Sequence, residues 1–249
     1  MTLPNPRTRL EGAQRVRTAL LEGKPVVRVV LLPRGPLRPP LAALEREALA
    51  AGATIWRAGE GDLRRMSAVS AEPAEAIAMC GPSPSANLTQ ALARGGISWL
   101  LHRAGYPSNV GFAVRTAEVS GADAVIVDAP NWNRADRSRA SHVSMGADRL
   151  LPVLFESTQA TLEAARAHGH RILALEDAGQ APPFEHDLTG GVLIVVGNER
   201  SGVPADVLSA CDQVMRIPMP GFIPSYNVQA AIAAVAYERV RQLHQAAIG

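Results

Sequence analysis

The alternation of short apolar runs with amphipathic stretches after residue 96 is the feature that most constrains the fold. Runs at Ile97–Leu101, Arg171–Leu175 and Val192–Val196 predict strands, and the stretches between them have helical spacing. The Val192–Val196 run is apolar at every position, which is typical of a strand that is buried on both faces of a parallel sheet. Strands that alternate with helices predict an α/β fold, with helices on both faces of a parallel sheet.

The same region contains weaker patterns that complete this prediction. We expect further strands at Ala124–Val127, Leu150–Leu154 and Val214–Ile217. We expect helices at Asn109–Ser120, Thr158–His168, Pro204–Ala210 and Tyr226–Gln245.

Residues 1–85 give a smaller α/β pattern of their own. Helices are predicted at Leu10–Glu22, Leu41–Ala51 and Asp62–Met66, and strands at Val26–Leu32, Ala53–Trp56 and Glu75–Met79. The sequence GPSPS at residues 81–85 is dense in residues that break regular structure, and we expect 86–96 to complete a linker. The prediction is a domain at 1–85, a linker at 86–96 and a second domain at 97–249.

Charge is distributed unevenly along the chain. Residues 1–95 contain 13 basic and 8 acidic residues, whereas residues 96–249 contain 12 basic and 15 acidic ones. A basic front segment favours a polyanionic partner such as a nucleic acid. The alternative is an ordinary solvated surface, because differences of this size also arise by chance.

Several classes of protein are excluded by what the sequence lacks. No apolar run approaches the roughly 18 residues of a membrane span, and the first residues contain no apolar core of a secretory signal. Cys80 and Cys211 are too few for a disulfide scaffold, so we expect a cytoplasmic protein that does not bind membranes. The six histidines have no metal-ligand spacing, and no metal site is predicted.

Two segments place polar residues directly after predicted strands. In the first, PSNVGFAVRTAEVSG, Asn109 begins a helix and Arg115 lies off its apolar stripe. In the second, VLIVVGNERSGVP, Gly197 allows close backbone approach, and Asn198 and Glu199 follow it. Open α/β sheets bind ligands at this edge. The alternatives are a helix cap at Asn109, a solvated arginine and an ordinary glycine turn.

A third segment, IPMPGFIPSYNVQAAIAAVAYE, lies near the end of the chain. Pro218, Pro220 and Pro224 stiffen an extended loop, and Ser225 is expected to cap the helix that follows. That helix is rich in alanine, which suits close packing within the chain or against another subunit. The chain has neither the G-x-G-x-x-G fingerprint nor a phosphate-binding lysine loop, which disfavours a Rossmann-type nucleotide enzyme.

One loop has two open interpretations. Asn131–Arg139, NWNRADRSR, combines three arginines with Trp132. It is either a plain solvated loop or an RNA-contacting loop whose tryptophan stacks on a base.

In this order and at these distances, the three segments resemble the motifs of the SPOUT superfamily, in its TrmH (SpoU) branch. The matching positions are Asn109, Gly111, Arg115-Thr116-Ala117 and Gly121, then Gly197-Asn198-Glu199 and Gly202, then Ile217-Pro218-Met219 and Ser225-Tyr226-Asn227-Val228. Ser144-Met145-Gly146-Ala147 is similar to the small-residue stretch of the family. The resemblance covers residues 97–249, and the front domain is similar to the family's substrate-binding domain, which resembles a small RNA-binding ribosomal protein.

The resemblance implies a fold, a cofactor and an assembly. The fold would contain a deep trefoil knot, an exception to un-knotted topology. The chain would be a homodimer that binds S-adenosylmethionine (AdoMet). The implied cofactor-binding residues are Val196, Gly197, Ile217, Pro218, Met219, Tyr226 and Asn227.

The implied reaction is methyl transfer to a ribose 2′-hydroxyl of RNA, with ribosomal RNA favoured. Arg115 would orient the hydroxyl and stabilise developing oxyanion charge, since arginine stays protonated. Asn109 and Glu199 would hold its guanidinium, while Ser225 and Asn227 would shape the pocket and orient the ribose. Two alternatives are a transfer-RNA methyltransferase and a non-catalytic RNA-binding protein that retains the knot.

Overall fold

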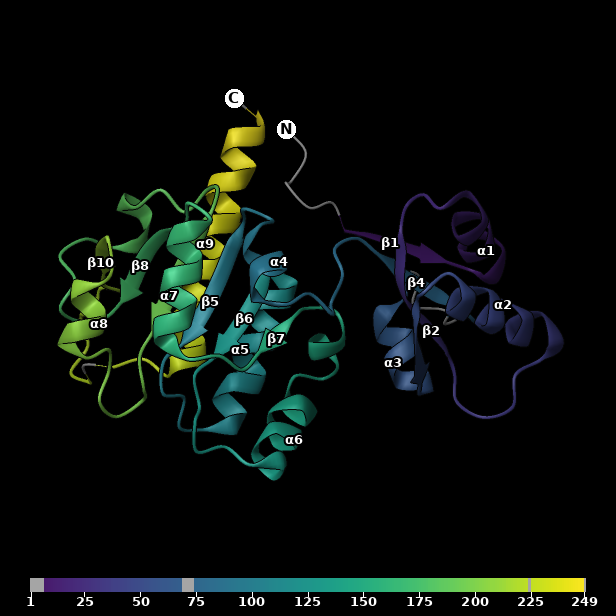
Figure 1. The fold of residues 1–249 in the computed structure, drawn as a ribbon, viewed down its shortest axis with the longest axis horizontal. Helices are drawn as coiled ribbons and strands as arrows, with labels where there is room; N and C mark the ends of the chain where they lie inside the picture. Colours follow the sequence, from purple (N-terminus) through teal and green to yellow (C-terminus); the bar gives the residue numbers. More distant parts are fainter. Residues whose placement is uncertain (1–6, 69–73, 224, 249) are drawn as a thin grey trace. The chain divides into compact units, whose positions relative to one another are not determined.

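The computed structural model describes residues 7–68, 74–223 and 225–248 (Figure 1). The chain divides into two compact units, with the boundary between Ser83 and Pro84. Each unit has its own sheet and its own hydrophobic core, and each is described by itself.

The N-terminal unit is a four-stranded sheet covered by helices. Its elements are β1 (Thr8–Glu11), α1 (Ala13–Glu22), β2 (Val27–Pro33), α2 (Pro39–Ala50), β3 (Thr54–Ala58), α3 (Glu60–Met66) and β4 (Ile77–Cys80). The strand order is β1-β4-β2-β3, with β2 and β3 parallel and the other two pairs antiparallel.

Strand β1 is a correction to the sequence prediction, which began a helix at Leu10. Leu10 instead pairs with Ala78 of β4, and Gly12, with a φ of 91°, separates the strand from α1. A four-residue strand is too short to show its own alternation, and its partner lies almost seventy residues away. Long-range pairing therefore overrides the local helical spacing.

The C-terminal unit is a six-stranded parallel sheet with helices on both faces, which confirms the predicted α/β class. Its strands are β5 (Ile97–Leu101), β6 (Ala124–Val127), β7 (Val153–Leu154), β8 (Arg171–Leu175), β9 (Val192–Val196) and β10 (Gln213–Met215), in the order β10-β8-β9-β5-β6-β7. Its helices are α4 (Leu88–Leu92), α5 (Pro107–Val119), α6 (Arg134–Val143), α7 (Thr158–Ala167), α8 (Ala205–Ser209) and α9 (Val228–Ile248), with short 3₁₀ turns at Ala147–Arg149 and Pro183–Glu185.

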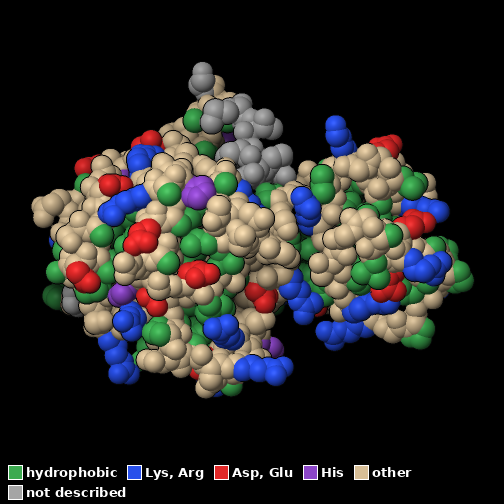
Figure 2. Space-filling model, viewed as in Figure 1, with side chains coloured by type: hydrophobic (Ala, Val, Ile, Leu, Met, Phe, Trp, Pro, Cys, Tyr) green, Lys and Arg blue, Asp and Glu red, His purple; other side chains and the backbone are tan. Residues whose placement is uncertain are grey.

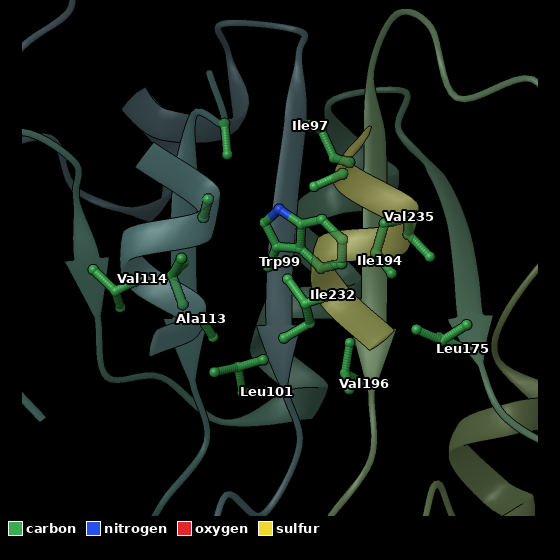
Figure 3. Packing of buried hydrophobic residues seen from close by; sticks show 14 of the residues in the cluster. Ile97, Trp99, Leu101, Ala113, Val114, Leu175, Ile194, Val196, Ile232 and Val235 are labelled. Atoms are coloured by element: carbon green, nitrogen blue, oxygen red, sulfur yellow. The ribbon is translucent and has the colours of Figure 1, made fainter. Parts of the chain in front are cut away.

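Alternate residues of the central strands build the two layers of this core. Trp99 and its neighbours two residues away on β5 face α5 and α9, and Figure 3 shows the Trp99 ring between Ala113 of α5 and Val235 of α9. Leu100 faces the opposite layer, where it packs with Leu162 of α7 and Val207 of α8. Because β5 and β9 are buried on both faces, they hold the loops at their carboxyl ends rigidly.

Helix α4 lies inside the segment that was expected to be a linker, 86–96. Asn87 and Gln90 form a reciprocal capping box, with bonds of 2.9 and 3.0 Å between side chain and backbone. Ala91 and Leu92 are fully buried in the core of the C-terminal unit. The segment is therefore part of that unit, and the cap was readable from its N-x-x-Q spacing.

Several other element bounds differ from the prediction. The strand expected at 150–154 is only the two-residue β7, because Leu150 and Leu151 close hydrogen-bonded turns on Ala147. Helix α9 begins at Val228 rather than at Tyr226 and has 21 residues. Among the described residues, no helix is both long enough and apolar enough to cross a lipid bilayer.

The motif glycine Gly111 has a packing role between α5 and α6. A Cβ at Gly111 would lie 2.5 Å from the Ala140 carbonyl oxygen and 2.6 Å from the Val143 Cβ. The two helices therefore cross at a distance that only glycine permits. Both follow parallel strands and pack on the same face of the sheet, so they run in the same direction.

We predict that the free energy of unfolding decreases as the pH is lowered, in a window set by two buried histidines. Burial lowers the pKa of His102 and of His170 below 6.5. The unfolded chain therefore takes up protons first, so the stabilisation is complete above about pH 7 and is lost as pH falls through the folded-state pKa values. The midpoint of thermal unfolding should fall as the pH is lowered from 7.5 to 5. The double variant His102→Asn with His170→Asn should show a smaller dependence of the midpoint on pH.

The control is His244→Asn, at an exposed position of α9. That variant should keep the wild-type pH dependence. The lowered pKa values of Asp187 and Glu238 act below this window, because their carboxyls titrate from 3.8 and 4.5 downward. An unfolding midpoint that stays constant from pH 7.5 to 5 would contradict the prediction.

Candidate functional site

A pocket of about 260 Å³ opens at the carboxyl edge of the C-terminal sheet, at the ends of β8, β9 and β10. Ligands of open α/β sheets bind at this edge. The pocket wall comes from three stretches that are far apart in sequence: Leu175–Asp177, Val196–Gly202 without Ser201, and residues between Arg216 and Ala231. The last two contain the second and third sequence motifs.

The loop after β9 is a tight hairpin closed by glycines. The amide of Asn198 donates to the Gly202 carbonyl at 3.2 Å, and the Gly202 amide returns a bond to Asn198 at 2.9 Å. A Cβ at Gly197 would lie 2.2 Å from the Gly202 carbonyl carbon, and Gly202 has a φ of 65°. Both glycines are required for this turn.

Glu176 holds the hairpin from the neighbouring strand, a role that the sequence reading missed. Its Oε2 accepts the Val203 amide at 2.7 Å, and a Cβ at Gly202 would lie 2.5 Å from that oxygen. Asp177, next in sequence, pairs with Arg216 at 2.8 Å. Two carboxylates directly after a predicted strand were a usable signal, although nothing local revealed their partners.

The third motif supplies the opposite wall of the pocket. Ile217, Met219 and Tyr226 line it together with Ser225, while Pro218 and Asn227 are absent from the lining. The expectation that Ser225 caps the last helix was wrong. Asn227 is the cap, because its Oδ1 accepts the Gln229 amide at 2.9 Å.

A chain of hydrogen bonds joins the three motifs beside this pocket. Glu199 Oε1 accepts from Asn109 Nδ2 at 2.9 Å, and Asn109 Oδ1 accepts from Asn227 Nδ2 at 3.3 Å. The Glu199 carboxylate also accepts the amides of Gly105 and Tyr106 at 3.1 and 3.4 Å. Asn109 thus lies within the first turn of α5, where it links the motifs and does not cap the helix.

Arg115 lies elsewhere, and its expected partners within the chain were wrong. The guanidinium is not held by Asn109 or Glu199. Instead its Nη1 contacts the sulfur of Met145 at 3.0 Å, in the small-residue stretch after α6. The side chain is exposed and borders a groove between α5 and α9 that also contains Phe112 and Tyr237.

A buried polar trio after β5 and β6 anchors the loop that precedes α5. The Thr158 hydroxyl donates to Asp128 Oδ2 at 2.7 Å and therefore accepts from His102 Nδ1, also at 2.7 Å. The next residue, Arg103, has a φ of 50°, and its carbonyl accepts from Asn198 Nδ2. The described residues contain no cluster of three or more side chains able to hold a metal ion.

Comparison with known proteins agrees with this arrangement. Residues 97–237 match the SpoU rRNA Methylase family, and this span includes β5 to β10 and all three motifs. The chain belongs to this family.

Individual members resemble the chain to different extents. The 23S rRNA (guanosine-2′-O-)-methyltransferase RlmB of Xanthomonas axonopodis pv. citri is 27% identical over 93% of this chain and 95% of its own length. RlmB of Pseudomonas syringae pv. tomato is 33% identical, but over 55% of this chain and 54% of its own length. The crystal structure of the SpoU methyltransferase AviRb from Streptomyces viridochromogenes, in complex with AdoMet, matches with a TM-score of 0.58 and 25% identity, covering 96% of this chain and 91% of AviRb.

We predict that Gly197→Ala opens the hairpin of this family member. Its Cβ has no room beside Gly202, and overpacking of this kind costs about 1–3 kcal/mol. Urea unfolding followed by tryptophan fluorescence should show that loss, and amide exchange at Asn198 and Gly202 should accelerate. Gly221→Ala is the matched control, because a Cβ there meets no atom within 4 Å. Equal exchange rates in the two variants would refute the close-contact role of Gly197.

Proposed function

We propose that the protein transfers the methyl group of AdoMet to a ribose 2′-hydroxyl of ribosomal RNA. The observation that supports this most directly is the Glu199–Asn109–Asn227 chain, which brings the three SpoU motifs to one pocket. The rRNA substrate is supported by the RlmB relative whose alignment spans both units. A transfer-RNA substrate has narrower support, because the similar structure described for 2′-OH methylation of C/U34 on tRNA covers 60% of this chain.

The residues that line the pocket have the chemistry needed to bind AdoMet. Val196, Ile217 and Met219 offer apolar surface for the adenosyl group, and Gly197 lets the backbone approach closely. The carboxylate of Glu176 borders the same cavity, where its negative charge suits a ligand with a sulfonium and an ammonium group, whereas the neighbouring Asp177 is paired with Arg216. Tyr226 completes the wall, while Pro218 and Asn227 support it from outside the lining. When bound, AdoMet supplies an electrophilic methyl group.

Arg115 has the properties of a group that stabilises charge on the reacting ribose. A guanidinium stays protonated, so Arg115 orients the hydroxyl and its phosphate and stabilises the developing oxyanion rather than accepting the proton. Its partner within the chain is a thioether sulfur, a weak acceptor that leaves the positive charge available. Ser225, which lines the pocket, and the neighbouring Asn227 orient the ribose.

A homodimer would bring Arg115 to a second copy of the pocket. Helices α5 and α9 expose a contiguous apolar face, with Phe112 at 43%, Val119 at 77%, Tyr237 at 73% and Val240 at 41% exposure. Arg115 borders the groove on this face. Apolar surface of this kind marks an interaction site on a soluble protein. We place the dimer interface here and the deep trefoil knot of the family at the loops around the pocket.

The N-terminal unit has the charge of an RNA-binding module. Before residue 84 the chain has 12 basic residues and 8 acidic ones. Arg15, Arg34 and Arg46 are exposed. We propose that this small α/β domain binds rRNA for the methyltransferase domain, and such a substrate implies a cytoplasmic protein.

We predict that the wild-type protein transfers the tritiated methyl group of labelled AdoMet to a 23S rRNA transcript. The label should lie at one ribose, and the phosphodiester bond after that ribose should resist alkaline cleavage. Arg115→Ala should lower the transfer rate by roughly a hundredfold or more, as when a charge-stabilising group is removed. Its effect on stability should stay within about 1 kcal/mol, because the side chain is exposed. Arg115→Lys should rescue poorly, since an ammonium lacks the planar fork.

Calorimetric titration with AdoMet controls for the integrity of the pocket in these variants. If a variant keeps its AdoMet affinity, its lower rate of methyl transfer comes from a lost interaction with the reacting ribose and not from a damaged cofactor pocket. Near-wild-type turnover by Arg115→Ala would remove this residue from the mechanism, and a wild-type protein that neither binds AdoMet nor labels rRNA would refute the proposed reaction.

We predict that deleting residues 1–83 weakens binding to the same transcript more than tenfold and lowers its salt dependence. Each lost phosphate contact should reduce the slope of log affinity against log salt by about 0.7–0.9. Filter binding at several salt concentrations measures both quantities. The shortened protein should keep its AdoMet affinity, and an unchanged slope would contradict the role of this unit.

A further inference from the structure

Helix α6 presents a basic surface that the proposed reaction does not use. Three of its ten residues are arginines, Arg134, Arg137 and Arg139, and all three side chains are exposed. Figure 2 shows basic side chains at the lower end of the C-terminal unit, where α6 lies in Figure 1. We call Arg134, Arg137 and Arg139 the α6 arginines.

Arg137 is held in one orientation by an aromatic ring. Its guanidinium carbon lies 3.9 Å from the centroid of Phe155, within the range of a cation–π contact. Trp132 also contacts this ring, with centroids 6.2 Å apart and planes tilted by 52°. Trp132 is half-buried against the core, so it is a support rather than an exposed platform for a base.

The positive charge of Arg134 and Arg137 is not neutralised locally. Among the described residues, neither arginine has an ion pair or donates a hydrogen bond to a protein acceptor. Asp136 accepts the Asn133 amide at 3.2 Å and lies 3.9 Å from Arg139. Asp148 accepts the hydroxyls of Ser141 and Ser144 at 2.5 and 2.7 Å. A stacked guanidinium with unused N–H groups along its edge is suited to a phosphate.

The position of α6 relates this surface to the reaction. The helix starts after β6, at the sheet edge that holds the pocket, and ten residues extend it about 15 Å. It runs beside α5 in the same direction, in contact at Gly111, and the stretch after it meets Arg115 through Met145. The N-terminal end of α6, with Arg134 and Arg137, therefore lies at the carboxyl edge of the sheet, and its C-terminal end leads to Met145 and Arg115.

We propose that the α6 arginines bind backbone phosphates of the substrate RNA next to the methylated nucleotide, with Arg137 as the pre-oriented contact. This inference rests on the proposed function and assigns it a second RNA-binding surface, within the methyltransferase domain. Phosphate contacts position a nucleic acid without reading its sequence. The surface therefore sets the affinity and register of the RNA and leaves the cofactor untouched.

The test compares charge-matched variants on a 23S rRNA transcript. Arg134→Gln with Arg137→Gln should weaken binding about tenfold or more and reduce the salt slope by about 0.7 per lost contact. The KM for RNA should rise, while kcat and the AdoMet affinity stay near wild type. Arg137→Lys keeps the charge but loses the planar stack on Phe155. Its RNA affinity should therefore lie between that of the wild type and that of the Arg134→Gln, Arg137→Gln variant.

The control is Arg166→Gln with Arg171→Gln, which removes the same charge from α7 and β8. Arg166 lies on the opposite layer of helices, and Arg171 lies at the other edge of the sheet. The proposal is overturned if this control weakens RNA binding and the salt slope as much as the α6 variant, or if the α6 variant binds like wild type. Absence of methyl transfer by the wild-type protein would instead refute the proposed function, because RNA affinity and salt slope are measured without AdoMet.

Discussion

The Glu199 carboxylate is the interaction on which the arrangement of the site depends. It accepts two backbone amides and one side-chain amide from the segment that starts α5, and those residues lie 90 to 94 positions away in sequence. A carboxylate that accepts several N–H groups is a strong, directional partner. The hairpin after β9 and the first turn of α5 are thereby held together, and Asn227 joins them through Asn109. The third motif thus meets the other two through this one amide, beside the Asp177–Arg216 ion pair that precedes it.

Close approach of backbones is the second constraint, and it explains the glycines that the motifs contain. Gly111 lets α6 pack against α5, and Gly197 lets the hairpin fold back on Gly202. In both places a Cβ would lie within about 2.6 Å of a neighbouring atom. The first contact aligns α6 with Arg115, and the second shapes the pocket. Packing and chemistry therefore depend on the same two residues.

The site is divided between groups that bind and a group that acts on the ribose. The carboxylates of Glu176 and Asp177 border the pocket, whereas Arg115 lies on an exposed apolar face with a sulfur as its neighbour. This separation is the physical reason for proposing that two copies complete each other. It also leaves the outer surface of α6, with Arg137 stacked on Phe155, open to a long polyanion.

The class of the C-terminal unit and most of its strands could be predicted from the sequence, because apolar periodicity is a local property and runs such as Val192–Val196 have no other stable environment. The order of the three motifs was likewise visible as residue types and spacing. Strand β1 and the partner of Arg115 could not be predicted, since each depends on a contact with a distant segment. The cap at Asn227 is a local bond from the Gln229 amide, which the sequence prediction assigned to Ser225 instead. Glu176 shows the same limit, because its partner Val203 lies on the next strand's loop. Local sequence determined most of the elements, with β1 as an exception, and only tertiary packing decided which side chains meet, because hydrogen bonds and steric contacts act over a few ångströms of space regardless of separation along the chain.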